Sequence, residues 1–287
     1  MSERIDVRKT HKLYVGGAFV RSESGRSYLV SDAKGRFFAN AAQASRKDVR
    51  DAVGAARKSF AGWSGATAYN RGQVLYRVAE VMEGRRAQLV DEVASGEGLT
   101  RRRADTFVTE AIDRWVWYAG WADKLAQVFG NANAVAGPYF DFSVPEPTGV
   151  VGVLAPQLSS LLGLVSVVAP VIVSGNACVV VASEHRPVPA ITLAEVLATS
   201  DVPGGVVNVL TGLTGELAPW LASHRDINAI DLTGAAQDHV VELEVAAADN
   251  LKRVYRDGGE PSWTDPPTTS RLRHFLETKT VWHPVGR

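Results

Sequence analysis

The second half of the chain alternates short β-branched runs with segments that are long enough to form helices. The runs are Val150–Leu154, Ala177–Ala182, Val206–Leu210, Ile227–Leu232 and Leu251–Tyr255. Short apolar runs separated by helix-length segments are typical of βαβ units, in which a parallel sheet is covered on both faces. The pattern therefore predicts an α/β fold with a doubly wound parallel sheet in this half of the chain.

The first half of the chain has helical spacing. Ser45 is placed to cap a helix whose apolar stripe is Val49, Val53, Ala56 and Phe60. A longer single helix is predicted next, ending near Gly96 or Gly98, with the stripe Val74, Val78, Val81, Leu89 and Val93. A third is expected from about 104 to 125, with packing roles for Trp115, Trp117 and Trp121.

Strand-like runs flank these helices. Two lie within residues 12–30, and Tyr139–Ser143 alternates as a strand does, with Pro145 and Pro147 expected to close it. Residues 257–267 have the composition of a linker. After them, Leu272 and its apolar neighbours indicate a short helix that leads into a strand over Thr278–Trp282.

Composition excludes several classes of function. Lys plus Arg and Asp plus Glu are equal at 31 each, so there is no basic surplus for binding nucleic acid. Residues 1–10 lack the apolar core of a secretory signal, and the apolar run Leu161–Val173 is too short to span a bilayer. We therefore expect a cytoplasmic protein with no membrane partner, and a single cysteine excludes an internal disulfide.

Motifs for other chemistries are absent from the sequence. There is no phosphate loop, no Gly-x-Gly-x-x-Gly, no His-Glu-x-x-His and no Gly-x-Ser-x-Gly. The six histidines are scattered without the spacing of metal ligands, so no metal site is expected.

Several segments resemble the aldehyde dehydrogenase family. The helix segment 114–124 resembles the family's aromatic helix, and Glu146–Pro156 resembles its entry into the first nucleotide-binding strand. Gly175-Asn176, Glu184, Pro187 and Leu232-Thr233-Gly234 follow in the family's order, and Glu277–Trp282 resembles the family's C-terminal strand. The resemblance covers most of residues 12–256 and the tail, but only a short connector follows Gly259 where the family has its catalytic domain.

The resemblance implies a division of the chain. Residues 1–137 would form the N-terminal helical part of a cofactor domain, 138–148 an assembly strand, and 149–258 the Rossmann-like region. A linker at 259–270 and an assembly tail at 271–287 would follow. Phe140–Val144 and Thr278–Trp282 would form a small assembly sheet, and removal of the catalytic domain is expected to expose an apolar face and a sheet edge.

The resemblance also implies that the catalytic groups are missing, so no catalytic residue is assigned. The family uses a cysteine nucleophile, but Cys178 lies in an apolar strand and is interpreted as a core residue. The family's oxyanion-binding Asn corresponds to Leu158, which cannot donate a side-chain hydrogen bond. Arg256 or Asp257 stands where the family has its general base.

Cofactor binding is expected to be weak or absent. The family's Lys-Pro-Ala-Glu reads Val181-Ala182-Ser183-Glu184, so the ribose-binding lysine is lost and only Glu184 remains, which has an equal claim to be an exposed loop carboxylate. At the pyrophosphate site Ala235 replaces a serine, and His239 replaces a glycine. The candidate residues for NAD or NADP, by resemblance, are Pro156, Glu184, Gly212, Thr233 and Gly234.

We expect a catalytically inactive aldehyde dehydrogenase homologue that acts as a structural or regulatory subunit. Its partner would be a full-length aldehyde dehydrogenase subunit or a second copy of itself. Two alternatives remain open at this point. One is a weak NAD-binding module or residual oxidoreductase, and the other is an enzyme whose site is shared between subunits.

Overall fold

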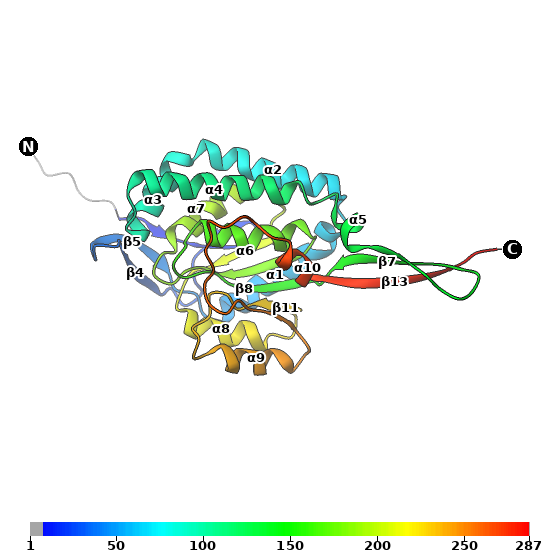
Figure 1. Cartoon of the computed structure of the whole chain (residues 1–287). Helices are drawn as coiled ribbons and strands as arrows, with labels where there is room; N and C mark the ends of the chain where they lie inside the picture. Colours follow the sequence, from blue (N-terminus) through cyan, green and yellow to red (C-terminus); the bar gives the residue numbers. More distant parts are fainter. Residues whose placement is uncertain (1–7, 287) are drawn as a thin grey trace, which may run out of the picture.

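The computed structural model describes residues 8–286, and its centre is a seven-stranded sheet with the order β12-β11-β8-β9-β10-β2-β3 (Figure 1). The parallel strands are β8 (Val150–Leu154), β9 (Ala177–Val181), β10 (Val207–Leu210), β11 (Ala229–Asp231) and β12 (Arg253–Tyr255). The parallel part of the sheet starts with β8 and continues outward through β9 to β10. The chain then returns to the other side of β8, where it forms β11 and β12. The predicted doubly wound sheet is confirmed.

An antiparallel pair extends this sheet. β2 (Leu13–Val15) joins β10, and β3 (Ala18–Val20) forms the edge. A separate three-stranded sheet contains β1 (Thr10–His11), β4 (Ser27–Ser31) and β5 (Phe37–Ala42). The sequence pattern did not predict β5, because Phe37 and Phe38 are followed by a run of alanine and asparagine that lacks β-branched residues.

Helices cover both faces of the central sheet (Figure 1). On one face lie α1 (Arg46–Ser64), α8 (Thr214–Ser223) and α9 (Val240–Ala248), and their apolar side chains share a core with Val150, Val179 and Val181. On the other face lie α2 (Ala68–Gly84), α3 (Arg86–Glu97), α4 (Arg101–Ala119), α6 (Leu162–Val173) and α7 (Val188–Leu197). Alternate residues of one strand therefore point into different cores, as the period of a strand requires.

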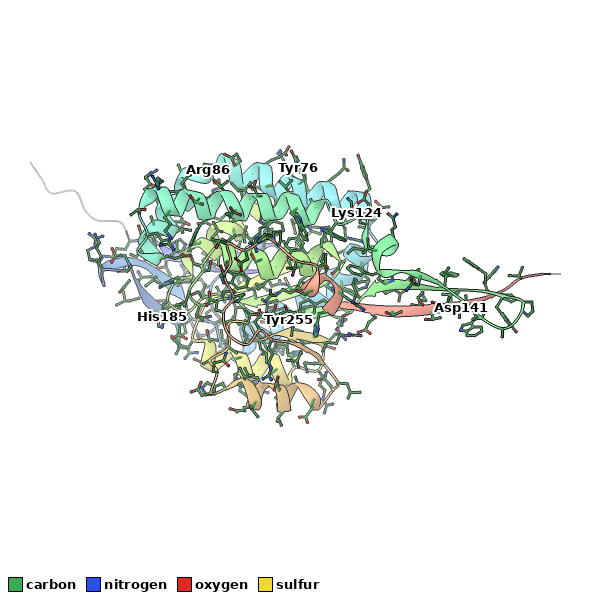
Figure 2. All side chains as sticks on the ribbon, viewed as in Figure 1. Tyr76, Arg86, Lys124, Asp141, His185 and Tyr255 are labelled. Carbon is green, nitrogen blue, oxygen red and sulfur yellow. The ribbon has the colours of Figure 1, made fainter. Side chains whose placement is uncertain are left out.

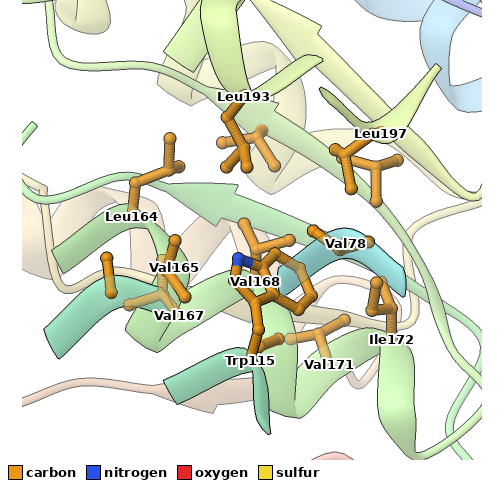
Figure 3. Close-up of a cluster of buried hydrophobic side chains, with 14 of the residues drawn as sticks. Val78, Trp115, Leu164, Val165, Val167, Val168, Val171, Ile172, Leu193 and Leu197 are labelled. Carbon is orange, nitrogen blue, oxygen red and sulfur yellow. The ribbon is translucent and has the colours of Figure 1, made fainter. Parts of the chain in front are cut away.

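Trp115 lies at the centre of the second core. Its side chain is fully buried, and Figure 3 shows it beside Val168 and Val171 of α6 and Val78 of α2. Trp117 and Trp121 pack against the same cluster while remaining partly exposed. The interpretation of this aromatic segment as packing residues is confirmed.

The helix boundaries differ from the predicted ones in two places. Ser45 and Asp48 form the expected capping box of α1. The predicted long second helix is wrong, because the backbone turns at Arg85 and divides it into α2 and α3, although both halves bury their stripe in one core. The third helix begins earlier, with Thr100 as its N-cap, and ends at Gly120, after which α5 (Leu125–Phe129) is separate.

A third sheet projects from the body of the molecule as a long ribbon (Figure 1). It contains β6 (Asn131–Asn133), β7 (Tyr139–Pro147) and β13 (Leu276–Pro284), all antiparallel, in the order β13-β7-β6. Pro145 and Pro147 were expected to close the strand after Ser143, but β7 continues through Pro145 and ends at Pro147. They are tolerated because β6 pairs only with residues 141–143, so one side of β7 is open at the prolines.

The connector between β12 and β13 is packed against the body. It has no regular structure until α10 (Ser270–His274), in keeping with its composition, but Trp263, Leu272 and Phe275 are buried in the core with Trp115. Arg114 of α4 donates hydrogen bonds to the carbonyl oxygens of Trp263 and Asp265. The segment therefore adds apolar side chains to the core that contains Trp115. In the part of the chain that the structure describes, no helix is long and apolar enough to cross a membrane.

We expect Trp263→Ala to lower the free energy of unfolding by about 3 kcal/mol, because a large buried side chain is lost from the core. The change in the urea midpoint measures this effect. Thr264→Ala is the control, since the neighbouring side chain is exposed, and its effect should stay within about 0.5 kcal/mol. Equal midpoints for the two variants would show that the connector does not contribute to the core.

Candidate functional site

A pocket of about 430 Å³ opens at the carboxyl ends of the parallel strands. Gln157 enters it from the loop after β8, Glu184 and His185 from the loop after β9, and residues 233–237 from the loop after β11. Ala218 and Pro219 of α8 face Leu243 of α9 across it. Strand order reverses between β8 and β11, and ligands of doubly wound sheets bind at such a switch point.

Three of the five candidate cofactor residues line this pocket. Glu184, Thr233 and Gly234 are brought together there, although the sequence separates Glu184 from Gly234 by about fifty residues. Pro156 and Gly212 lie outside the lining. Pro156 packs against Gly163 at the start of α6, where a Cβ atom would come within 3.0 Å of it. Gly212 passes close to the Ala44 backbone, where a Cβ atom would lie 3.1 Å from the nitrogen.

Glu184 is half-buried and has a structural partner. Its Oε2 accepts a hydrogen bond of 2.9 Å from the backbone nitrogen of Thr214, the first residue of α8. Its own backbone nitrogen donates to Gln157 Oε1 at 3.0 Å. A carboxylate at a helix start stabilises the unpaired N–H groups there, so Glu184 stabilises α8 without a ligand.

Gly234 is explained by close packing between strands. Its nitrogen donates to the Leu154 carbonyl at 2.9 Å, and a Cβ atom at this position would lie 1.9 Å from the Ala155 carbonyl oxygen. Any side chain would therefore separate the loop after β11 from the end of β8. The glycine is required for the pocket's floor whether or not a cofactor binds.

Thr233 belongs to a buried ionic cluster around Arg271. The Arg271 Nε donates to Asp231 Oδ2 at 2.9 Å, and its Nη2 donates at 2.6 Å both to Asp257 Oδ2 and to Thr233 Oγ1. Thr233 Oγ1 in turn donates to Asp231 Oδ1 at 2.5 Å. Burial opposes the charge of Arg271, yet Asp231, Tyr255 and Asp257 together raise its pKa above the usual value. The threonine hydroxyl is thus fully engaged.

The sequence did not predict this cluster. Arg271 lies in a tail assigned to assembly, and Asp231 lies within a run interpreted simply as a strand. The sequence did contain one indication of the cluster, the charged Asp231 within an apolar run. An aspartate inside an apolar parallel strand requires a buried partner. The identity of that partner depends on the path of the connector.

The single cysteine, and the two positions matched to the family's oxyanion donor and general base, lie as follows in the structure. Cys178 is fully buried at the centre of the sheet, and burial raises the pKa of its thiol. Leu158 exposes 64% of its surface and offers only its backbone. Asp257 is held by Arg271 and lies within 3.3 Å of the Tyr255 hydroxyl, so its carboxylate is not a free base.

The pocket is acidic. Glu184, Glu242 and Glu260 contribute carboxylates to its lining, whereas no Lys or Arg does among the described residues. The two histidines of the lining are His185 and His239. Figure 2 labels His185 on the side of the molecule away from Tyr76, which belongs to helix α2. The residues fit a dinucleotide only in part, because the pocket has the space and the glycine but no cation to meet a pyrophosphate.

Glu260 was not predicted from the sequence as a pocket residue. Its Oε2 accepts from the Leu158 nitrogen at 3.1 Å, and its Oε1 accepts from the Ser159 nitrogen at 3.0 Å. Within residues 8–286, no group of three or more His, Cys, Asp or Glu side chains is arranged to hold a metal ion.

A larger hollow of about 830 Å³ lies between α2 and the end of α4, lined by Tyr69, Tyr76 and Lys124 among others. It contains none of the candidate residues, and it lies on the outer surface of the helical layer. We therefore place the candidate site at the switch point of the sheet.

Comparisons with known proteins agree with this architecture. A profile of the aldehyde dehydrogenase family matches residues 19–260. Retinal dehydrogenase 2 of Gallus gallus is 32% identical over 263 residues, which are 90% of this chain and 50% of that protein. Omega-crystallin of Enteroctopus dofleini is 30% identical over 249 residues, 85% of this chain and 50% of that protein. The chain thus spans about half the length of the curated relatives it matches.

Solved structures show the same fold. HpcC from Thermus thermophilus superposes with a TM-score of 0.82 at 28% identity, covering 86% of this chain and 48% of that one. The NAD+ complex of an aldehyde dehydrogenase from Bacillus cereus has a TM-score of 0.82 at 24% identity, covering 86% and 50%. At this identity the second likeness shows the fold alone.

We expect Arg271→Leu to destabilise the fold by about 3–5 kcal/mol, because it leaves the Asp231 carboxylate buried without its partner. Arg273→Leu is the matched control, since Arg273 lies on the same short helix and is exposed. Urea unfolding of the two variants measures the difference. A loss below about 1 kcal/mol in Arg271→Leu would contradict the structural role of the cluster.

Proposed function

The chain belongs to the aldehyde dehydrogenase family, and on that premise we propose that it is a catalytically inactive member. It acts in the cytoplasm as a structural or regulatory subunit beside a complete NAD(P)-dependent aldehyde dehydrogenase. The observation that carries the proposal is the place of Cys178, the single cysteine of the sequence, at the centre of the buried sheet. A thiol that no aldehyde can reach cannot form a covalent intermediate.

The residues at the positions of the oxyanion donor and the general base also support the proposal, independently of Cys178. Leu158 supplies no side-chain donor to an oxyanion, and loss of one such donor costs about 10²–10³ in rate. Asp257 Oδ2 accepts a hydrogen bond from the Arg271 guanidinium, so this carboxylate oxygen already has a partner within the chain. A substitution that restored one of the three groups, the nucleophile, the oxyanion donor or the base, would therefore still leave the other two absent.

Cofactor binding is proposed to be weak or absent. Glu184 and Thr233, the two candidate residues with polar side chains, are both occupied by partners within the chain. Three carboxylates line the pocket, and like charges repel a pyrophosphate at close range. NAD or NADP remains the ligand class that the family membership favours.

Assembly is proposed to occur through the projecting sheet. A ribbon that is two-stranded over most of its length is marginally stable by itself, and its unpaired edges are suited to pairing with another chain. Tyr139 and Trp282 stack edge to face with centroids 5.7 Å apart, and Phe140 is 53% exposed beside them. Exposed aromatic residues on a strand edge favour a protein partner.

The second candidate function is a weak NAD-binding module, or an oxidoreductase whose site is completed by a partner subunit. The pocket of about 430 Å³ with Glu184, Thr233 and Gly234 in its lining favours it. Activity that appears only after mixing with a complete dehydrogenase, and that depends on Glu184, would distinguish this candidate from a purely structural subunit.

The purified chain should not reduce NAD or NADP with aliphatic, aromatic or semialdehyde substrates, because its one thiol is buried, Leu158 offers no side-chain donor to an oxyanion, and Asp257 is bound by Arg271. Absorbance of the reduced cofactor measures turnover, with a complete aldehyde dehydrogenase as the positive control. Cys178→Ser should leave the baseline unchanged. Turnover in the wild type that this substitution abolishes would end the proposal of inactivity.

Deletion of residues 277–287 should release the partner while the sheet core stays folded, since it removes nearly all of β13. Trp282→Ala should weaken association by about 2 kcal/mol, whereas Val285→Ala, beyond the strand, should not. Size-exclusion chromatography with light scattering and affinity capture of a dehydrogenase measure both effects. A stable monomer that captures no dehydrogenase contradicts the assembly proposal, and a homo-oligomer retains the interface while removing the partner.

A further inference from the structure

The carboxylate of Glu260 is bound as an anionic ligand would be. Its two oxygens accept hydrogen bonds from the consecutive backbone nitrogens of Leu158 and Ser159, at 3.1 Å and 3.0 Å. The indole Nε1 of Trp263 donates to the same carboxylate at 3.0 Å. Adjacent backbone N–H groups that converge on one point form an oxyanion-binding arrangement, and charge-assisted hydrogen bonds of this kind are among the strong ones.

This carboxylate also forms part of the pocket at the switch point. Glu260 shares the lining with Gln157 from the loop after β8, and with Thr233 and Gly234 from the loop after β11. The Leu158 and Ser159 nitrogens belong to the same loop as Gln157. If the Glu260 side chain left, these two donors would become available to a ligand at that end of the pocket.

The segment that carries Glu260, residues 258–269, is here called the strap. Its far part is firmly attached, because Trp263 is buried and Arg114 binds the carbonyls of Trp263 and Asp265. Its near part begins with Gly258 and Gly259, and no atom lies within 4 Å of a Cβ built on either. Glu260 therefore lies between two glycines without close neighbours and a buried anchor, and its displacement would break the hydrogen bond from the Trp263 indole but not the Arg114 contacts that hold the anchor.

The charge of the pocket opposes an anionic ligand while Glu260 is in place. Glu184 and Glu242 are the other carboxylates of the lining, and no Lys or Arg among the described lining residues compensates them. The Leu158 and Ser159 nitrogens follow Gln157 of the lining, and Glu260, which also lines the pocket, accepts from both. They are satisfied by the chain's own carboxylate.

We propose that the strap is an autoinhibitory element, in which Glu260 occupies the oxyanion site of the nucleotide pocket and competes with the phosphate of a nucleotide. This inference rests on the weak cofactor binding proposed above, and it attributes that weak binding to the Glu260 carboxylate. Affinity for a phosphate-bearing ligand is reduced by the fraction of molecules in which the strap is closed. Opening of the strap exposes the Leu158 and Ser159 donors and removes one negative charge from the pocket.

The test compares NAD binding to four variants that each remove one negative charge, two of them at Glu260 and two at control positions. Glu260→Gln weakens the internal competitor while preserving its size. Glu242→Gln removes a carboxylate from the same lining, but one that is exposed and does not bind the backbone donors. Asp265→Asn removes an exposed charge from the strap itself, away from the pocket. Glu260→Ala repeats the main change in case the glutamine keeps the same hydrogen bonds.

Isothermal titration with NAD should show affinity that is about tenfold or more higher in Glu260→Gln and Glu260→Ala than in the wild type. Glu242→Gln should gain less than threefold, and Asp265→Asn should not change. In Glu260→Gln, inorganic phosphate should compete with NAD, because both need the same two nitrogens. Hydrogen exchange at Leu158 and Ser159 should become faster in both Glu260 variants and slow again when NAD is added.

Unchanged NAD affinity in folded Glu260→Gln and Glu260→Ala would overturn the proposal and leave Glu260 as a structural anchor of the connector. Equal gains in Glu260→Gln and Glu242→Gln would also overturn it, since general electrostatics would then explain the effect. Urea unfolding shows whether each variant is folded. These outcomes are separate from the fate of the proposed function, which aldehyde turnover and partner capture decide.

Discussion

The ion pair between Arg271 and Asp231 is the interaction on which the rest of this structure depends. It joins the end of β11, the second strand from one edge of the sheet, to the short helix that leads into β13. Both side chains are buried, so neither charge can return to water while the fold is intact. The same guanidinium holds Asp257 after β12 and the Thr233 hydroxyl at the pocket floor. The path of the connector, the floor of the pocket and the start of the projecting ribbon are thereby fixed together.

Because Arg271 attaches the connector to the sheet, the connector contributes both to the core and to the pocket. Trp263, Leu272 and Phe275 extend the core that surrounds Trp115. The same segment carries Glu260 into the pocket. Packing and ligand exclusion are therefore physically coupled, since a change that loosens the strap also changes what the pocket can bind. Arg114 contributes to both through the carbonyls of Trp263 and Asp265.

Two of the motif residues in the pocket have structural reasons to be present. A side chain at position 234 would clash with the Ala155 carbonyl oxygen, so this position needs glycine. Glu184 accepts a hydrogen bond from the first residue of α8. Both residues therefore contribute to the stability of the fold without a ligand. Residues that match a family motif at a site can be retained for packing after their ligand contacts have weakened. For this reason the polar partners within the chain, more than the presence of the motif residues, describe what the site can do.

The sequence by itself determined the sheet, its two covered faces and the cap at Ser45, because periodicity and capping act over a few neighbouring residues. It also placed Cys178 in the core and grouped Glu184, Thr233 and Gly234 as one candidate site. The break at Arg85, the continuation of β7 through Pro145, and the strand β5 depended on neighbours distant in the chain. Only the tertiary structure decided that Arg271 pairs with Asp231 and that Glu260 binds the Leu158 and Ser159 nitrogens. Both contacts join residues that are 40 or more positions apart through a segment without periodicity, so no local pattern in the sequence encodes them.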